Sequence, residues 1–225
     1  TGGVDHISIH HENEIAQSKG ATGKIPSNYW MHCEFLLVNG GKMSKSLNNL
    51  YTLKDLGEKG YSPLDYRMFN FSSHYRNKIN FTFEAMDAAK SALKRLKEGY
   101  RNHVQGNEII EENILQDYEN RFLQAINDDL NMPVAMSIVW EVIKNPNKSK
   151  QLAELLKKFD IVLGLKIDEE EQKVDLPKEI LDLIEQRKQA REQKDWKKSD
   201  ELRDLILTKG YIVKDSKEGM TVEKK

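Results

Sequence analysis

The clearest candidate for chemistry in this chain is a loop that carries two lysines. Lys42 and Lys45 lie three residues apart, with Ser44 between them, and they directly follow the glycine pair Gly40-Gly41. Ammonium groups with hydroxyl or amide donors in such a loop can neutralise the charge that develops on a departing pyrophosphate. The alternative is an ordinary solvated basic loop, because short basic motifs often occur by chance.

A histidine and a glutamate form a second candidate. His10 and Glu14 are separated by four residues, so on a helix they project from one face and can both bind a metal. Zinc sites normally need three or four ligands, and the alternative is therefore a surface pair on a polar helix. We expect Cys33, the single cysteine, to be a buried core residue rather than a further ligand.

Turn signals and hydrophobic periodicity predict the elements that position these residues. Residues 2–7 indicate a strand end and loop, His10 to Gln17 a short helix, and Tyr29 to Val38 a strand that the turn Asn39-Gly40-Gly41 releases into the lysine loop. Helix N-caps are predicted at Thr52 and Ser62. Apolar residues spaced three and four apart predict helices over Phe83–Tyr100, Ile114–Ile126, Pro133–Ile143 and Leu152–Leu163. The fold class should be mainly α with a small α/β portion.

The C-terminal region differs in composition from the helices before it. The acidic run from Asp168 to Glu171, followed by Leu176-Pro177, predicts a solvated linker. Beyond it we expect helices over 179–193 and 195–208 and then a small hairpin. The predicted domains are therefore residues 1–61, 62–167 and 178–225.

A cluster of cations around an aromatic residue marks the last domain as a candidate nucleic-acid surface. Trp196 lies near Arg187, Arg191 and Lys197, a composition that suits backbone phosphates and an unstacked base. The alternative is an amphipathic helical hairpin whose cations are balanced by acidic residues. The net charge of the chain is only −1, with +3 over 1–100, −6 over 101–177 and +2 over 178–225. Because the chain as a whole is not basic, any RNA contact must be local.

Bulk features limit the class of protein further. No segment approaches the roughly 20 apolar residues of a transmembrane helix, so we expect no membrane contact. A single cysteine cannot form an intrachain disulfide, which favours a reducing, cytoplasmic compartment. The chain begins at Thr1 without a start methionine or signal peptide, and we expect it to be a piece of something longer.

Several segments together resemble the cysteinyl-tRNA synthetase family of class I aminoacyl-tRNA synthetases. Lys42-Met43-Ser44-Lys45-Ser46 matches the second signature motif of that class at all five positions and follows a predicted strand. The segment from Thr1 to Gln17 looks like the family's adenosine and zinc region. Downstream, Ser73-His74-Tyr75-Arg76, Asn127 to Asn131 and Lys194-Asp195-Trp196 fall at the expected intervals. The order and spacing of these motifs make the resemblance specific.

The resemblance implies a fold and a set of ligand sites. The fold would be the end of a Rossmann-type catalytic domain, then an antiparallel helical bundle, then a small α+β anticodon-binding module. Lys42 and Lys45 would stabilise the triphosphate of ATP, which is bound with Mg. Gly2 and Gly3 would let the backbone approach the nucleotide, and Asp5 would bind the ribose, although Asp5 could equally cap a tight turn.

The resemblance also implies a metal and an RNA partner. His10 and Glu14 would hold zinc with two cysteines that the family places earlier than Thr1, so the zinc site is incomplete in this chain. Zinc would bind the thiolate of the substrate cysteine. Arg76 would lie where the helical part meets the inner corner of tRNA, with a packing junction as the alternative.

The leading functional hypothesis is a cysteine–tRNA ligase that uses cysteine, ATP and tRNA(Cys), acting as a cytoplasmic monomer. The family's other signature, His-Ile-Gly-His, is not in this chain, so the isolated piece should be inactive. One alternative is a stand-alone tRNA-binding or interaction fragment. Another is a ligase that joins cysteine to a small amine acceptor, which the basic C-terminal module argues against.

Overall fold

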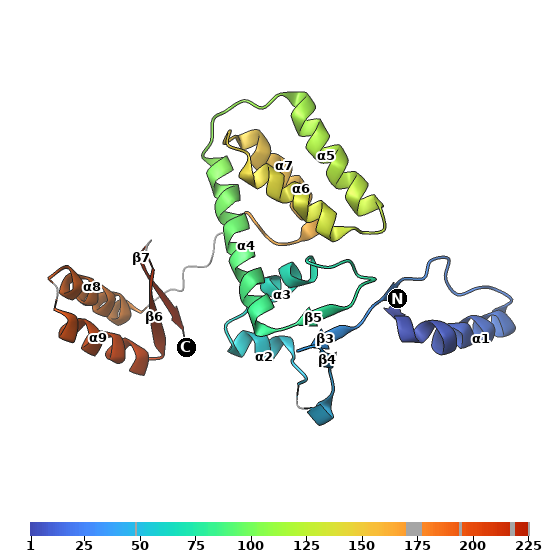
Figure 1. Cartoon of the computed structure of the whole chain (residues 1–225), viewed down its shortest axis with the longest axis horizontal. Coiled ribbons are helices and arrows are strands. Elements are labelled where there is room, and N and C mark those ends of the chain that lie inside the picture. The colour runs from blue at the N-terminus through green and yellow to red at the C-terminus, as the bar shows by residue number, and fades with distance from the viewer. Residues whose placement is uncertain (48, 170–176, 194, 217–218, 225) are drawn as a thin grey trace. The chain divides into compact units, whose positions relative to one another are not determined.

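The computed structural model describes residues 1–47, 49–169, 177–193, 195–216 and 219–224. The chain forms two compact units, Thr1–Asp168 and Glu169–Lys225 (Figure 1). The predicted acidic linker falls largely on residues 170–176, outside the described residues. The three-part division of the sequence remains a prediction.

The first unit opens with two short strands joined by a long helical connection. Strand β1 (Gly2–Gly3) pairs in parallel with β2 (His32–Cys33), with Gly2 opposite His32. Between them the chain forms a 3₁₀ turn, η1 (Val4–His6), a π-helical turn, η2 (Ile7–His11), and α1 (Glu12–Thr22). The helical stretch is therefore longer than the segment predicted from His10 to Gln17. Gly23 ends α1 with φ 73°.

The single strand predicted from Tyr29 to Val38 is wrong in its extent. The chain forms β2 and then β3 (Leu36–Val38), with Glu34 and Phe35 between them. The interruption occurs because the two halves pair with different partners: β2 pairs with β1, whereas β3 joins a second sheet. Cys33 is exposed on β2, so the expected burial of this residue is also wrong.

The second sheet has the order β4-β3-β5. Strand β4 (Gly41–Lys42) runs antiparallel to β3, and β5 (Ile79–Phe81) runs parallel to it. Asn39 and Gly40 form the two-residue hairpin turn with φ 50° and 76°, the left-handed pair that a type I′ turn requires. The side chain of Asn80 accepts a hydrogen bond from Gly40 N–H at 2.7 Å. The turn is thereby tied to β5.

Both predicted helix starts after the lysine loop are confirmed. Thr52 caps α2 (Leu53–Glu58) and Ser62 caps α3 (Pro63–Asn70). Each forms a capping box, in which the cap side chain accepts from Asp55 or Asp65 and that carboxylate accepts from the cap backbone N–H. The four longer helices also occur, as α4 (Phe83–Val104), α5 (Glu112–Asn127), α6 (Met132–Lys144) and α7 (Lys150–Leu163).

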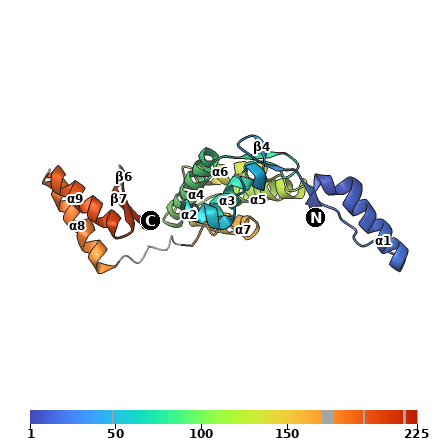
Figure 2. The same cartoon turned by 90° about the horizontal axis from the view of Figure 1, so that it is seen from below.

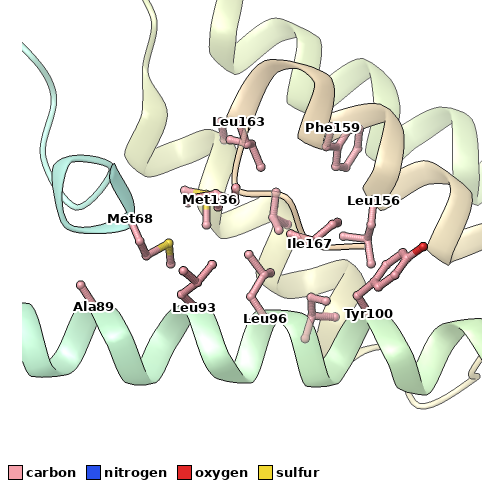
Figure 3. Close-up of a cluster of buried hydrophobic side chains, with 14 of the residues drawn as sticks. Met68, Ala89, Leu93, Leu96, Tyr100, Met136, Leu156, Phe159, Leu163 and Ile167 are labelled. Atoms are coloured by element: carbon pink, nitrogen blue, oxygen red, sulfur yellow. The ribbon is translucent and has the colours of Figure 1, made fainter. Parts of the chain in front are cut away.

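These helices share one apolar core, which lies along α4. Figure 2 shows the same group of helices from a second direction, and Figure 3 shows side chains of α4 facing those of α6 and α7. Leu96 is fully buried, with 0% of its surface exposed. The core includes residues from α3 and from the segment after α7 as well: Met68, Ala89, Leu93, Leu96, Tyr100, Met136, Leu156, Phe159, Leu163 and Ile167.

Two close approaches fix how α4 meets its neighbours. A Cβ atom added to Gly99 would lie 2.5 Å from Cγ2 of Ile143, and one added to Gly106 would lie 2.1 Å from the carbonyl carbon and oxygen of Lys148. Such distances are far below van der Waals contact, so both positions need glycine. At the second site Glu108 N–H donates to Lys148 O at 3.0 Å.

A buried histidine joins the same elements. His103 of α4 is 0% exposed. Its Nε2 lies 2.9 Å from Val142 O, and its Nδ1 accepts from Ser149 N–H at 3.4 Å. Since Nδ1 is the acceptor, Nε2 carries the proton of a neutral ring. Burial, and then the nearby Lys148, lower the pKa of His103.

The second unit is a helical hairpin with a β-hairpin. It consists of α8 (Lys178–Glu192), α9 (Trp196–Thr208), β6 (Tyr211–Ser216) and β7 (Gly219–Lys224), with β6 and β7 antiparallel. Its small core includes Ile180, Leu183, Leu202, Ile206 and Val213. The predicted helix–helix–hairpin order is confirmed. No helix among the described residues is long and apolar enough to cross a membrane.

Candidate functional site

The lysine loop begins at the end of a β-hairpin and is closed by one side chain. Asn49 accepts a hydrogen bond from Ser44 N–H at 2.8 Å and donates one to Lys42 O at 3.0 Å. Ser44 Oγ accepts from Leu47 N–H at 3.3 Å, which starts the 3₁₀ turn η3 (Lys45–Leu47). Lys42 is exposed. The backbone of the loop is thus held by its own polar groups while the Lys42 ammonium faces solvent.

Met43 anchors this loop to the apolar core of the first unit. Its side chain packs against the core and, with Tyr51 and Phe81, lines a small cavity of about 130 Å³. The residues flanking Met43 are polar and the methionine is not, so the loop has one inward side and one outward side. The side chain of Lys45 lies outside the described part of the structure, and its predicted role remains a prediction.

The glycine pair at β1 lies against a group of histidines. A Cβ atom at Gly2 would meet Nδ1 of His6 at 2.8 Å and Cε1 of His11 at 2.9 Å, and one at Gly3 would meet Oδ1 of Asp5 at 2.5 Å. A side chain at either position would therefore displace a neighbouring side chain, an imidazole at Gly2 and the carboxylate of Asp5 at Gly3. Asp5 is exposed in the middle of the 3₁₀ turn η1, which follows β1, so its carboxylate is accessible.

Four imidazoles gather at this turn, and we call them the histidine cluster: His6, His10, His11 and His32. His6 stacks on His10 with ring centroids 4.8 Å apart, and His11 Nδ1 lies 2.7 Å from His32 Nε2. At that distance one nitrogen donates a proton and the other accepts it. Partial burial and the neighbouring His11 lower the pKa of His32.

His32 was missed by sequence reasoning, as was Trp30, whose ring centroid lies 4.7 Å from that of His11. Neither residue is near the others in sequence. They reach the cluster because β2 pairs with β1, which brings His32 opposite Gly2. A parallel pairing of two-residue strands leaves no periodic signal in the sequence.

The predicted metal ligands lie on one helical stretch. His10 is in η2 and Glu14 is in α1, both are exposed, and the four-residue spacing separates them by about one helical turn. Among the described residues, no three histidine, cysteine, aspartate or glutamate side chains are placed to hold a metal ion. His10 and Glu14 can thus provide at most two of the four ligands that zinc usually takes.

Arg76 has an intramolecular partner. Its Nε donates to Oδ2 of Asp129 at 2.5 Å, and its guanidinium lies 5.2 Å from the ring centroid of Tyr75. The side chain is nevertheless 62% exposed. The packing alternative for this residue is thus realised, and a contact with RNA remains a prediction.

The cation cluster of the second unit is divided by burial. Trp196 is 58% exposed and the Arg191 guanidinium lies 5.9 Å from its ring centroid, while Lys197 is exposed. Arg187, by contrast, is 2% exposed. Its expected surface position is wrong because it lies on the face of α8 that also carries Leu183 and Ala190 into the core.

Another cavity is formed by the helices of the first unit. It has a volume of about 700 Å³ and is lined mainly by apolar side chains of α3, α4 and α6, with Arg95 and Trp140 among them. None of the residues predicted from the sequence to bind ligands lines it.

Comparison with known proteins identifies the class. The family model described as the tRNA synthetases class I (C) catalytic domain matches residues 1–91, a DALR domain matches 121–168, and the cysteinyl-tRNA ligase anticodon binding domain matches 173–222. The agnB2 LeuRS of Agrobacterium radiobacter K84, solved in a ternary complex with tRNA and LeuAMS, has a similar fold. Its TM-score is 0.56 at 17% identity, over 74% of this chain and 25% of that one. The matches to the family models place the chain in the class I aminoacyl-tRNA synthetases.

Curated relatives narrow the family. The chain is 36% identical over 240 residues to the cysteine–tRNA ligase of Protochlamydia amoebophila (strain UWE25), covering 99% of this chain and 50% of that protein. It is 38% identical to cysteine–tRNA ligase 1 of Burkholderia lata, covering 97% and 46%. For the cysteine–tRNA ligase of Chlamydia felis the identity is 40%, with 99% and 50% covered. The chain belongs to the cysteinyl-tRNA synthetase family and spans about half the length of these relatives.

Proposed function

We propose that the protein containing this chain is a cysteine–tRNA ligase. It would form cysteinyl-adenylate and pyrophosphate from cysteine and ATP, and then transfer cysteine to the terminal ribose of tRNA(Cys). The observation that carries this proposal is the agreement of nearly the whole chain, at 36–40% identity, with proteins of that activity. The exposed Lys42 on a loop of fixed backbone supports it from the geometry.

In the first step the carboxylate of cysteine attacks the α-phosphate of ATP, which is bound with Mg, and pyrophosphate leaves. Lys42 and Lys45 would stabilise the negative charge that develops on the leaving group. Gly2 and Gly3 would let the backbone approach the adenosine, and Asp5 would orient the ribose. The short distances from an added Cβ atom to the neighbouring side chains support a preference for glycine at both positions.

His10 and Glu14 would provide two ligands to zinc, with the remaining ligands coming from residues outside this chain. Bound zinc would select the thiolate of cysteine over the hydroxyl of serine, because a soft ligand suits this metal better. In the second step the tRNA ribose hydroxyl attacks the carbonyl of the adenylate and AMP leaves.

The RNA surface that we propose consists of Arg191, Trp196 and Lys197, with Arg76 as a separate contact in the first unit. The exposed indole beside Arg191 supports stacking of an unpaired base next to a phosphate. Arg187 is left out of this surface because it is buried. We further propose a monomeric cytoplasmic enzyme with the domain limits 1–61, 62–167 and 178–225.

The test is cysteine-dependent ATP–pyrophosphate exchange by the full-length protein. Replacing Lys42 or Lys45 with alanine should lower kcat by about 100-fold or more, as expected when a charge-stabilising donor is removed. Lys54→Ala is the matched control, because Lys54 is an exposed lysine on α2 whose partner is Glu58. Exchange driven by another amino acid, or a Lys45→Ala variant as active as Lys54→Ala, would refute the assignment.

A stand-alone tRNA-binding fragment is a second candidate, favoured by the exposed indole of Trp196 beside Arg191. Filter binding of the 225-residue chain to tRNA(Cys) at several salt concentrations tests it. Phosphate contacts predict an affinity that falls steeply with salt, and an affinity that is indifferent to salt excludes them.

The match of residues 173–222 to an anticodon binding domain argues against a small amine as acceptor.

A further inference from the structure

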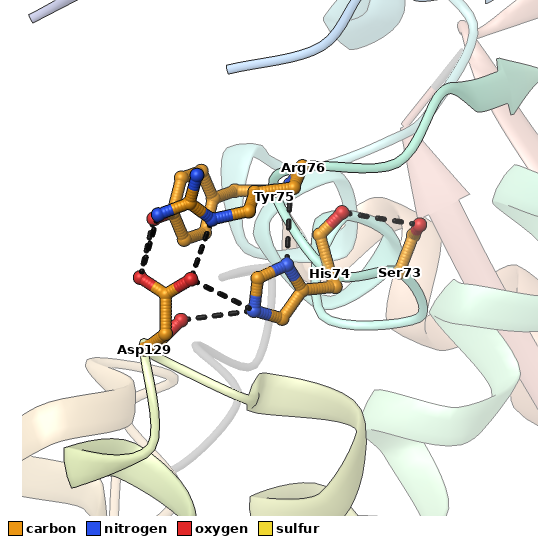
Figure 4. Close-up of polar contacts among 5 residues, drawn as sticks. All are labelled: Ser73, His74, Tyr75, Arg76 and Asp129. Atoms are coloured by element: carbon orange, nitrogen blue, oxygen red, sulfur yellow. Dashed lines mark hydrogen bonds and ion pairs between the residues drawn. The ribbon is translucent and has the colours of Figure 1, made fainter. Parts of the chain in front are cut away.

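One carboxylate in the turn between α5 and α6 receives several groups from a distant segment (Figure 4). Asp129 accepts hydrogen bonds from Tyr75 Oη at 2.5 Å and from Arg76 at 2.5 Å through Nε and 3.3 Å through Nη2. His74 Nε2 lies 2.9 Å from the backbone oxygen of Asp129. Arg76 N–H donates to His74 Nδ1 at 3.2 Å, so Nε2 is the nitrogen that donates to Asp129. We call this arrangement the Asp129 clasp.

Local geometry on both sides of the clasp restricts its conformation. Asp129 and Leu130 have φ 52° and 56°, a left-handed conformation that is unfavourable for residues other than glycine and persists only where surrounding contacts enforce it. On the other side the rings of His74 and Tyr75 stack with centroids 4.8 Å apart. Arg76, and then Tyr75, hold the pKa of Asp129 below its usual range, so the carboxylate is charged at neutral pH.

The segment that the clasp holds also touches β2. The backbone oxygen of Tyr75 accepts a hydrogen bond from Glu34 N–H at 2.9 Å. Glu34 directly follows β2, whose His32 lies opposite Gly2 and contacts His11 at 2.7 Å. Hydrogen bonds and the backbone between them therefore connect the helical bundle to the strand pair that carries the glycines and the histidine cluster.

We infer that Asp129 is a positioning residue: by holding residues 74–76 it fixes the place of β2, and through β2 the geometry of the histidine cluster beside Gly2. The effect of Asp129 on turnover rests on the proposed function, whereas its effect on the position of β2 does not. Asp129 lies in the region that matches the DALR domain, and β2 lies in the region that matches the catalytic domain. The clasp thus joins the region that matches the DALR domain to the region that matches the catalytic domain.

The same helical bundle contains an ion pair of comparable exposure that does not involve residues 74–76. Arg121 of α5 donates to Glu141 of α6 at 2.8 Å, and Glu141 is 46% exposed, close to the 47% of Asp129. An exposed ion pair by itself contributes little to stability. Glu141→Gln therefore removes a comparable charge contact without touching residues 74–76, and it is the control for Asp129 variants.

The first test measures amide hydrogen exchange of Glu34 in the full-length protein. Asp129→Ala should speed exchange of the segment 31–37 by about tenfold, because the acceptor Tyr75 O is no longer held, while Glu141→Gln leaves it unchanged. Asp129→Asn keeps one acceptor and should give an intermediate rate. Tyr75→Phe, which removes only the hydroxyl, should act in the same direction and serves if Asp129→Ala does not fold.

The second test measures cysteine-dependent pyrophosphate exchange in the same variants. Asp129→Ala should lower kcat/KM for cysteine by about fivefold or more, with Asp129→Asn partly rescued and Glu141→Gln within about 1.5-fold of the parent. Glu34 exchange at the parental rate in both Asp129→Ala and Tyr75→Phe overturns the inference. Faster Glu34 exchange with unchanged kcat/KM overturns the role in turnover. If the parent protein itself shows no cysteine-dependent exchange, the proposed function fails, and the amide measurement still decides the role of Asp129 in positioning β2.

Discussion

Replacing Gly106 with alanine tests the packing of the bundle most directly. Gly106 lies just after α4, where residues 106–108 run beside 148–149, and Asn107 forms an isolated β-bridge with Ser149. A new Cβ atom would lie 2.1 Å from the carbonyl carbon and oxygen of Lys148 and 2.5 Å from Ser149 N. All three are backbone atoms, so no side-chain rotation can relieve the overlap.

The magnitude follows from what must move. Reaching ordinary contact requires the two segments to separate by more than about 1 Å. Overpacking that forces such backbone shifts costs about 1–3 kcal/mol. The separation also breaks the Glu108 N–H to Lys148 O bond and weakens the one from Ser149 N–H to His103. A typical intramolecular hydrogen bond contributes about 1 kcal/mol. The expected loss is about 3 kcal/mol of the free energy of unfolding of the first unit.

Urea denaturation followed by far-UV circular dichroism measures this loss. With a slope of about 2 kcal/mol per molar urea, the midpoint of the first unit should fall by roughly 1.5 M. Gly57→Ala is the matched control, since Gly57 lies inside α2 and nothing lies within 4 Å of its added Cβ. That variant should be more stable than the parent by about 0.5–1 kcal/mol, because alanine is the better helix former.

The two variants make the same chemical change and should have opposite effects. A Gly106→Ala midpoint within about 0.3 M of the parent would refute the reasoning, because it would mean that the segments separate without losing their hydrogen bonds. Faster hydrogen exchange in α7 would identify the separated segment directly, since Ser149 is the N-cap of that helix.

Three further predictions concern other buried or exposed contacts. Because burial lowers the pKa of His103, its contribution to stability is complete above the unfolded pKa of about 6.5 and is lost as the pH falls below it, by up to about 1.4 kcal/mol per pH unit. His103→Gln should flatten this dependence in urea titrations between about pH 7.5 and 5.5, and an equal slope in both proteins would contradict the assignment. Gly99→Ala should lower the free energy of unfolding by about 2 kcal/mol, because the new Cβ atom would contact Cγ2 of Ile143. Combined with Ile143→Ala, it should show a coupling energy above about 1 kcal/mol, whereas additive losses would exclude the contact. Trp196→Ala should weaken tRNA binding by about tenfold in filter assays, and an unchanged affinity would remove the indole from the RNA surface.

The helical part of the fold could be predicted because its signals are local. The capping boxes at Thr52 and Ser62, the spacing of apolar residues along α4 and the left-handed Gly164 after α7 each act within a few residues of sequence. The type I′ turn at Asn39-Gly40 is a signal of the same kind. These elements were therefore found with bounds close to the structural ones.

The site was predicted less completely because its contacts are long-range. His32 and Trp30 join the histidine cluster through the pairing of β1 with β2, and Arg76 meets Asp129 across 53 residues. The burial of Arg187 and the exposure of Cys33 depend likewise on which face of an element is covered, which residue type alone does not decide. The resemblance named the site residues, but it could not supply these neighbours.

The side chain of Asn49, which bonds the backbone at both Lys42 and Ser44, has a consequence for the energetics of ligand capture. A free loop of this length would lose much of its conformational entropy only when a phosphate group arrived, and that loss would weaken binding. Here the backbone is already ordered by an intramolecular amide, so the entropy is lost during folding instead. If the loop binds a triphosphate as proposed, Asn49→Ala would weaken that binding even though no contact with the ligand is removed.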